Sequence, residues 1–172
     1  MDHYIPKRRI PVTLWSGDLG SLPGWIFLDL DATGNRHQTL LEKLNETSRF
    51  LPIAVGDDGR IQLVNAHRIS RVTAGRQVIQ SDLFTRGFQP WREEEADVTL
   101  DDGSNLAGRI WMPLERETQR VSDFMNQRGH DFFALITPIA VHLVNTEAVV
   151  GIRLAESAGA PLTATGGEQA AA

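Results

Sequence analysis

The chain has 172 residues, of which 41% are hydrophobic and 23% are charged, and its formal net charge is −5. This composition is typical of a soluble globular protein and lacks the basic surplus that most nucleic-acid-binding proteins carry. There is no cysteine, which excludes disulfides, thiolate metal sites and cysteine nucleophiles and fits a reducing cytoplasm.

Residues 1–11 are expected to form an N-terminal arm with a local cationic spot at Lys7, Arg8 and Arg9. These three side chains either contact phosphate or acidic protein, or are simply solvated. The arm has no apolar core of signal-peptide length. The longest apolar stretch, residues 132–144, is too short to span a bilayer. We therefore expect a cytoplasmic protein with no membrane span.

Residues 12–72 show the pattern of five short strands and one short helix. VTL and GWIFLDL alternate around a glycine-containing turn, TLLEKLNE has helical spacing, and FLPIAV, RIQLV and RISRV complete the set of strands. Asn65 lies at the tight turn before the last strand. This unit is predicted to be a small β-domain.

Residues 73–97 are expected to be a linker. RQVIQSDLF, residues 76–84, is interpreted as an additional strand, and the acidic run 93–95 as a solvated face. Trp91, Phe84 and Phe88 are large apolar side chains. We expect them to hold the linker against a neighbouring domain or to cover a partner.

Residues 98–154 repeat the pattern of the first unit. VTL is followed by the hairpin signal DDG, then by GRIWMPL, the helical pattern RVSDFMNQ, the apolar runs FFALI and IAVHLV, and AVVGIRL. Asn145 takes the place of Asn65. The tail, residues 155–172, is small and polar and is predicted to be disordered.

The two units match each other in detail. LVNAHRISRV, residues 63–72, corresponds to LVNTEAVVGI, residues 143–152, and Phe50 corresponds to Phe132. VTL at residues 12–14 is matched with VTL at residues 98–100. Glycines and asparagines follow one another in the same order in both units, which indicates an internal duplication.

VTLDDGSNLAGRI, residues 98–110, and LVNTEAVVGI resemble the opening and closing strands of Sm-like small barrels, within the broader SH3-like class. The resemblance implies a mainly β protein made of two tandem, strongly bent antiparallel barrels, each with one short helix. Two departures stand out, because the helix lies in the middle of each unit and the turns read Asn65-Ala66 and Asn145-Thr146 where the family has Arg-Gly.

No local pattern indicates a reaction. The chain has no phosphate-binding loop and no nucleotide fingerprint, and DLDATGN at residues 29–35 is interpreted as an acidic turn rather than a calcium loop. None of the histidines forms a metal-binding pair; they are His3, His37, His67, His130 and His142. We therefore expect no enzymatic activity, no metal and no cofactor. We expect His142 either to face outward from its strand or to form one satisfied hydrogen bond.

The repeated asparagines have two interpretations. Asn65 and Asn145 are either paired ligand contacts or turn residues in the left-handed conformation, and the structural interpretation is favoured. Asn45 and Asn126 are expected to cap the short helices. Trp25 and Trp111 are interpreted as core residues, with partner contact as the alternative.

The sequence favours a non-enzymatic protein-interaction module, acting as an adaptor or as a structural or accessory subunit, with a protein partner or self-assembly. The alternative, implied by the Sm-like resemblance, is binding of single-stranded RNA or a nucleotide. Its candidate residues are Asn65, His67 and Arg68, with phosphate contacts from Lys7, Arg8 and Arg9. Asn145 and Trp91 are the remaining candidate binding residues. Each unit carries more acidic than basic residues, which disfavours nucleic acid.

Overall fold

The computed structural model describes residues 7–30, 38–46, 48–79, 82–84, 91–113, 120–127 and 131–155. The strands are β1 (Lys7–Ser16), β2 (Gly20–Asp29), β3 (Phe50–Val55), β4 (Arg60–Asn65), β5 (Arg71–Gly75), β6 (Trp91–Leu100), β7 (Asn105–Pro113), β8 (Phe132–Ile136), β9 (Ala140–Asn145) and β10 (Val149–Leu154). The short helices are α1 (Leu40–Leu44) and α2 (Val121–Met125), with 3-10 turns η1 (Ala66–Arg68), η2 (Arg76–Ile79) and η3 (Thr146–Ala148).

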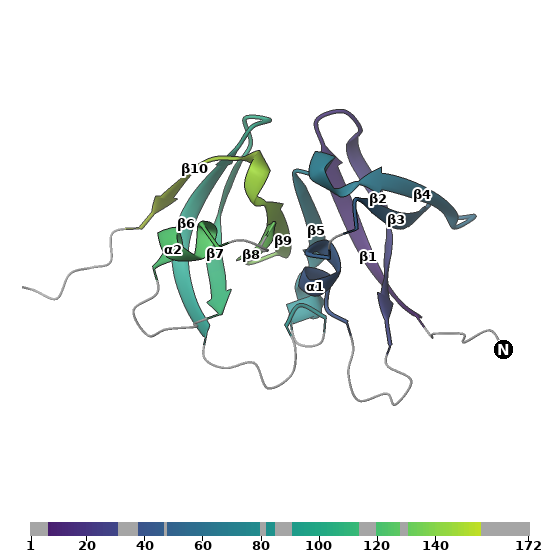
Figure 1. Ribbon diagram of the computed structural model, residues 1–172, viewed down its shortest axis with the longest axis horizontal. Helices are drawn as coiled ribbons and strands as arrows, with labels where there is room; N and C mark the ends of the chain where they lie inside the picture. Colours follow the sequence, from purple (N-terminus) through teal and green to yellow (C-terminus); the bar gives the residue numbers. More distant parts are fainter. Residues whose placement is uncertain are drawn as a thin grey trace, which may run out of the picture.

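The predicted mainly β fold is confirmed, but the described residues do not form two separate closed barrels. Ten antiparallel strands make one open sheet in the order β10-β6-β7-β8-β9-β5-β1-β2-β3-β4. Figure 1 shows β5 and β9 side by side in the middle of the molecule, with β4 and β10 at opposite ends. The two halves of the chain are thus joined by strand pairing.

Both halves have the same strand order, which we call the first repeat (β1–β5) and the second repeat (β6–β10). In each, the fifth strand pairs with the first, and the order continues through the second, third and fourth strands. The register identifies the equivalent residues: Val12 pairs with Gly24, and Ala96 pairs with Gly108. Val12 is therefore equivalent to Ala96 and not to Val98, so the sequence match of the two VTL segments is wrong by two residues. Strands that alternate apolar and polar residues align equally well after a shift of two.

The core has two parts, and β8 contributes to both. Phe132, Ala134 and Ile136 join the cluster built mainly by the first repeat, whereas Phe133 and Leu135 join the cluster of the second repeat. Every residue of β8 is buried. This explains the continuous apolar run FFALI, because a strand that is covered on both faces has no solvent-facing positions.

Local signals set the helices and turns much as predicted. Thr39 caps α1 in a reciprocal capping box with Glu42, at 3.1 Å and 2.9 Å. Asn45 and Asn126 are the C-cap residues of α1 and α2, as expected. Gly103 has φ of +81° in the turn between β6 and β7, so the DDG hairpin is confirmed.

The expected boundaries differ from the observed strands. β1 begins at Lys7, inside the predicted arm, and β6 begins at Trp91, inside the predicted linker. The strand expected at residues 76–84 is wrong, because the described part of this segment starts with η2 and continues as a turn at residues 82–84. The acidic turn beyond residue 30, His3, His37, Phe88, His130 and the tail from residue 156 lie outside the described residues.

Candidate functional site: the junction between the repeats and the two free edges

The cationic residues of the N-terminal strand lie against partners in β2 and in the segment after η2. Lys7 Nζ is 3.3 Å from Asp29 Oδ1, and Arg8 Nη1 is 2.8 Å from Asp82 Oδ1. The Arg9 guanidinium lies over the Phe27 ring, 5.5 Å from its centroid. Each cation is thus already placed against a carboxylate or an aromatic ring.

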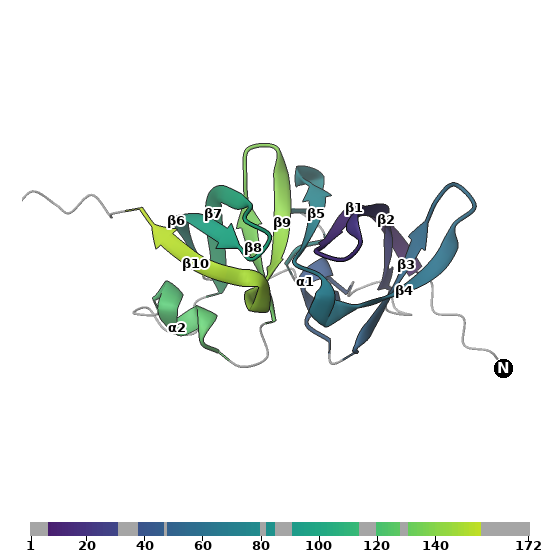
Figure 2. The same ribbon diagram turned by 90° about the horizontal axis from the view of Figure 1, so that it is seen from above.

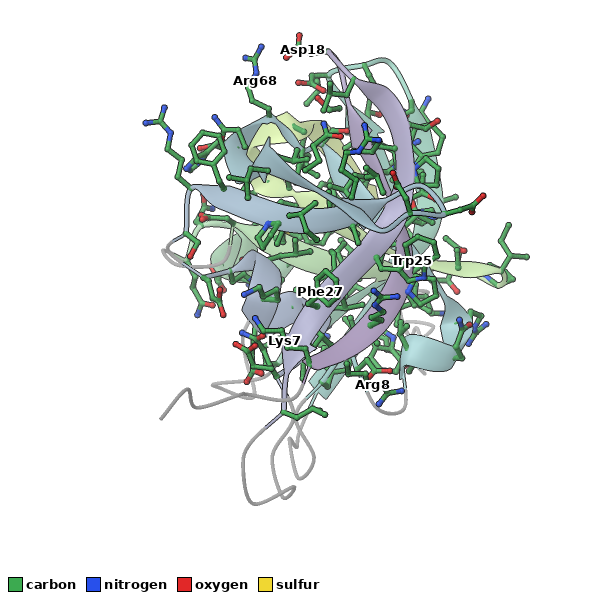
Figure 3. All side chains as sticks on the ribbon, turned by 90° about the vertical axis from the view of Figure 1, so that its right-hand side faces the viewer. Lys7, Arg8, Asp18, Trp25, Phe27 and Arg68 are labelled. Carbon is green, nitrogen blue, oxygen red and sulfur yellow. The ribbon has the colours of Figure 1, made fainter. Side chains whose placement is uncertain are left out.

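His67 and Arg68 lie at the other end of β1, beside the turn that carries Asp18. Figure 3 shows Asp18 and Arg68 together at one end of the molecule and Lys7 and Arg8 at the other. Arg68 donates to Asp18 Oδ2 from Nη2 at 2.6 Å and from Nε at 3.1 Å. His67 Nδ1 is 3.6 Å from Glu147 Oε2. The structure therefore separates the recognition turn proposed for RNA binding from the residues proposed for phosphate contact.

A hollow of about 360 Å³ lies between the turns of the two repeats. Its ionisable lining consists of Asp18, Asp101, Asp102, Glu147, Arg68 and His67. Carboxylates outnumber cations there, which is unfavourable for an anionic ligand. Within the described residues, no cluster of three or more histidines and carboxylates is arranged to hold a metal ion.

Asn65 and Asn145 cap 3-10 turns in the extended conformation, with φ of −67° and −73°. The left-handed conformation expected for them is therefore wrong. Asn65 Oδ1 accepts from His67 N at 3.1 Å, and Asn145 Oδ1 accepts from Glu147 N at 3.0 Å. Asn145 also reaches the first repeat, since its Nδ2 donates to Ile69 O at 2.9 Å. Among the described residues, the Asn65 side-chain amide has no equivalent acceptor.

The predicted aromatic contacts have different outcomes. Trp25 and Trp111 are both half-buried, and Trp111 packs against the core cluster built mainly by the first repeat. Phe84 stacks on Trp111 with 5.1 Å between ring centroids, so this linker aromatic does hold the linker against the second repeat. The backbone of Trp91 pairs with Pro113 at the start of β6, and its side chain lies outside the described part of the structure.

The junction between the repeats is an antiparallel pairing of β5 with β9. Val72 is opposite Leu143, Thr73 opposite His142, and Ala74 opposite Val141. Two asparagines extend the junction. Asn45, at the end of α1, donates from Nδ2 to Phe132 O at 3.1 Å and accepts from Phe132 N at 2.8 Å. Asn145 N donates to Ser70 O at 2.9 Å.

A buried arginine adds a polar contact across this junction. Arg71 of β5 is 8% exposed, lies 4.4 Å over the Trp15 ring and donates to Ser104 Oγ at 2.8 Å. Burial lowers the pKa of Arg71, and the nearby Asp102 carboxylate acts in the opposite direction. The guanidinium therefore ties the turn between β6 and β7 to the first repeat.

The two ends of the sheet expose strand edges and apolar side chains of the kind that the junction buries. Among the described strands, β4 and β10 each pair with a neighbour on one side only, so their outer backbone groups can accept another strand. Phe50, Ile61 and Leu63 are 50%, 54% and 64% exposed beside the β4 edge. At the β10 edge, Val150 and Leu154 are exposed. Both edges therefore combine unpaired backbone with apolar side chains.

A wide groove of about 780 Å³ runs over β6, β7 and the end of β10. Its ionisable residues are Arg76, Arg109, Arg153, Glu93, Glu95 and Asp97. Arg109 lies 3.2 Å from Glu93 and 3.6 Å from Glu95. This balance of charges gives the groove no preference for an anion or a cation.

Comparison with protein-family models, with curated proteins and with solved structures gives no match. In the described ranges, neither α-helix has the length and apolar character needed to cross a membrane. The apolar residues at the free edges were not among the candidate binding residues predicted from the sequence. The signal that could have found them is the repeat itself, because Phe50, Ile61 and Leu63 are equivalent to residues that need burial in the second repeat.

Proposed function

We propose that this chain is a non-enzymatic protein-interaction module that binds protein along its two free strand edges. In this role it is an adaptor or a structural or accessory subunit of a larger assembly in the cytoplasm. The observation that carries the proposal is the row of Phe50, Ile61 and Leu63 beside the unpaired edge of β4. Strand addition at an exposed edge supplies backbone hydrogen bonds, and neighbouring apolar side chains supply affinity.

The repeated strand order supports two tandem small barrels of the Sm-like or SH3-like type, opened and joined at β5 and β9. RNA binding, the alternative implied by that resemblance, receives less support. Lys7, Arg8 and Arg68 lie in ion pairs, and the two basic groups lie at opposite ends of β1 (Figure 3).

The experiment compares the full chain with variants that place a charge at each edge. The immobilised protein captures proteins from a lysate of its native cells, and captured proteins are quantified for the wild type, Leu63→Lys and Leu154→Lys. Added copies of the chain itself are isotope-labelled and counted separately. Ile139→Lys is the matched control, since Ile139 is 87% exposed and lies outside both edge strands.

We expect one or both edge variants to lose specific partners that the wild type and Ile139→Lys retain. Equal capture by all four proteins would overturn the proposal. A second arm titrates a fluorescent single-stranded RNA at low salt. Tight, salt-dependent binding of this RNA would favour the nucleic-acid function instead.

A further inference from the structure

The internal junction is a head-to-tail contact, so it pairs one kind of edge strand from each repeat and leaves the equivalent strand of the other repeat at an end of the sheet. It pairs the fourth strand of the second repeat, β9, with the fifth strand of the first repeat, β5. Within the described ranges, two strands have no outer partner: the fourth strand of the first repeat, β4, and the fifth strand of the second repeat, β10. They lie at opposite ends of the molecule (Figures 1 and 2), so they are placed for contacts between molecules.

We propose that the occupant of each free edge is a second copy of this chain, with β4 of one copy antiparallel to β10 of the next in the register of the internal junction. This inference rests on the proposed function and names its partner. Repeat equivalence places Leu63 opposite Ile152, Gln62 opposite Arg153 and Ile61 opposite Leu154, as Leu143, His142 and Val141 lie opposite Val72, Thr73 and Ala74.

The side chains that β3 and β4 would insert have buried counterparts in the same chain. Phe50 and Phe132 are equivalent because each pairs with the asparagine that ends the next strand. Phe132 is 2% exposed within the core of the first repeat, whereas Phe50 is 50% exposed. Leu143 is fully buried, whereas its counterpart Leu63 is 64% exposed. The β4 end therefore has the apolar residues of the junction without its cover.

The β10 end offers the matching receiving surface. Leu154 is 44% exposed, whereas its counterpart Ala74 is 4% exposed. Ile152 and Met125 are partly exposed. Their counterparts Val72 and Leu44 are buried in the core cluster that residues of β8 and β9 join. The residues equivalent to η2, 156–159, lie outside the described part of the chain.

Two asparagines are available to repeat the polar contacts. Asn126 ends α2 as Asn45 ends α1, is exposed, and donates from Nδ2 to Ser122 O at 2.7 Å. An amide nitrogen carries two hydrogens, so Nδ2 can donate a second bond while Oδ1 accepts one. In the proposed contact it bonds the Phe50 backbone as Asn45 bonds that of Phe132. Asn65 similarly donates to the carbonyl of Val149, the counterpart of Ile69.

One junction contact has no counterpart at the free edges. Gly151 stands where Arg71 contacts Ser104, so the contact between molecules lacks this buried guanidinium. We therefore expect it to be weaker than the internal junction and dependent on protein concentration. Because the contact is head-to-tail, it produces a closed ring if the rotation closes and a filament if it does not.

The test uses the absence of native cysteine. Full-length Gln62→Cys and Arg153→Cys are mixed and oxidised, so that a disulfide between the two different variants forms only between molecules. Residues directly opposite in an antiparallel pair lie about 4.5–5.5 Å apart at Cα, within disulfide range. Thr73→Cys/His142→Cys in one chain is the positive control, because these residues are the counterparts within the junction.

We expect a mixed disulfide dimer at twice the 19.1 kDa of the chain. Arg60→Cys in place of Gln62→Cys is the control, because Arg60 is two residues out of register with Arg153. The Gln62→Cys pair should form the mixed dimer at least about tenfold faster than this control pair. Leu63→Lys added to the Gln62→Cys protein should abolish it, with circular dichroism showing that the variant is folded. Equal rates for both pairs, or no mixed dimer while the internal control closes, would overturn the self-pairing. If self-pairing fails but the capture of other proteins still depends on Leu63, only the self-pairing proposal is wrong. If neither copies of the chain nor other proteins depend on the edges, the proposed function is wrong as well.

Discussion

Asn65 and Asn145 show how the same residue serves two environments in one chain. Each caps a 3-10 turn through its side-chain oxygen. Of these two residues, Asn145 is the buried one, at 2% exposure, and its Nδ2 donates across the junction to Ile69 O. A buried hydrogen bond stabilises little when made, but its loss leaves the partner unsatisfied.

We predict that Asn145→Ala lowers the free energy of unfolding by about 2–3 kcal/mol, because it leaves the Ile69 carbonyl and the Glu147 N–H without their partners. Asn65→Ala should cost only about 0.5–1 kcal/mol, the usual contribution of an exposed cap. Urea unfolding at a protein concentration that keeps the chain monomeric measures both. Equal losses for the two variants would show that the Asn145 bond to Ile69 adds nothing.

His142 makes the stability of the junction depend on pH. Its Nδ1 lies 3.0 Å from Thr73 Oγ1, which also accepts from Trp15 Nε1. Burial lowers the pKa of His142, and the Arg71 guanidinium lowers it further. The imidazole is therefore neutral in the folded protein near neutral pH. Of the two expectations for His142, the hydrogen bond is confirmed.

As the pH falls, His142 is protonated at a higher pH in the unfolded chain than in the folded chain, because folding lowers its pKa. The free energy of unfolding should therefore fall as the pH drops below about 6.5, the usual histidine pKa, and the fall should end below the lowered folded-state pKa. His142→Gln, which installs the residue of the equivalent β4 position, removes this contribution. Urea unfolding at about pH 7.5 and about pH 5.5 should show a smaller loss for the variant; an equal loss would assign the pH dependence to other groups.

Two equivalent glycines let the third strand of each repeat approach the second. A Cβ on Gly24 would lie 2.5 Å from Ala54 O, and one on Gly108 would lie 2.7 Å from Ile136 O. These distances involve backbone atoms, so a side chain there would push the strands apart. The close approach matters most in the second repeat, because β8 is packed on both faces.

We predict that Gly108→Ala lowers the free energy of unfolding by about 1–3 kcal/mol, the usual cost of overpacking. Gly17→Ala is the control, since nothing lies within 4 Å of its added Cβ, and it should change stability by less than about 0.5 kcal/mol. Thermal unfolding of both variants measures the difference. A Gly108→Ala protein as stable as the control would mean that β8 can shift without cost.

Elements that depend on neighbours in the sequence could be predicted. The helical spacing in TLLEKLNE, the C-cap asparagines and the DDG hairpin all form as expected, because each is set within a few residues. The alignment of VTL with VTL failed for the opposite reason, since a strand's register depends on its partner. The strand expected at residues 76–84 failed because an apolar alternation there serves a 3-10 turn, in which Val78 is buried.

The joining of the repeats could not be read from the residue pattern. Alternation shows which face of a strand is buried but not which strand lies beside it. The segment FFALI did indicate that β8 is covered on both faces, since a continuous apolar run is typical of a strand buried on both sides. The candidate binding residues were chosen for charge and for turn position, whereas the surfaces that the structure leaves open are backbone edges with apolar neighbours.

At the scale of the whole molecule, duplication explains both the architecture and the open ends. Two copies of one unit joined by different edges necessarily leave the complementary edges free. The junction shows that a fourth strand of one repeat fits a fifth strand of the other, because Phe132 and Leu143 fill the core of the first repeat. The equivalent apolar side chains of Phe50 and Leu63 are then available for packing against a partner.

The most direct test is the mass of the purified full chain in solution, measured by light scattering across a range of concentrations. We predict a mass that rises with concentration to an integer multiple of 19.1 kDa, and that returns to the single-chain value in Leu63→Lys but not in Ile139→Lys. A chain that stays at 19.1 kDa at every concentration, or an assembly that Leu63→Lys leaves intact, would contradict head-to-tail pairing of β4 with β10.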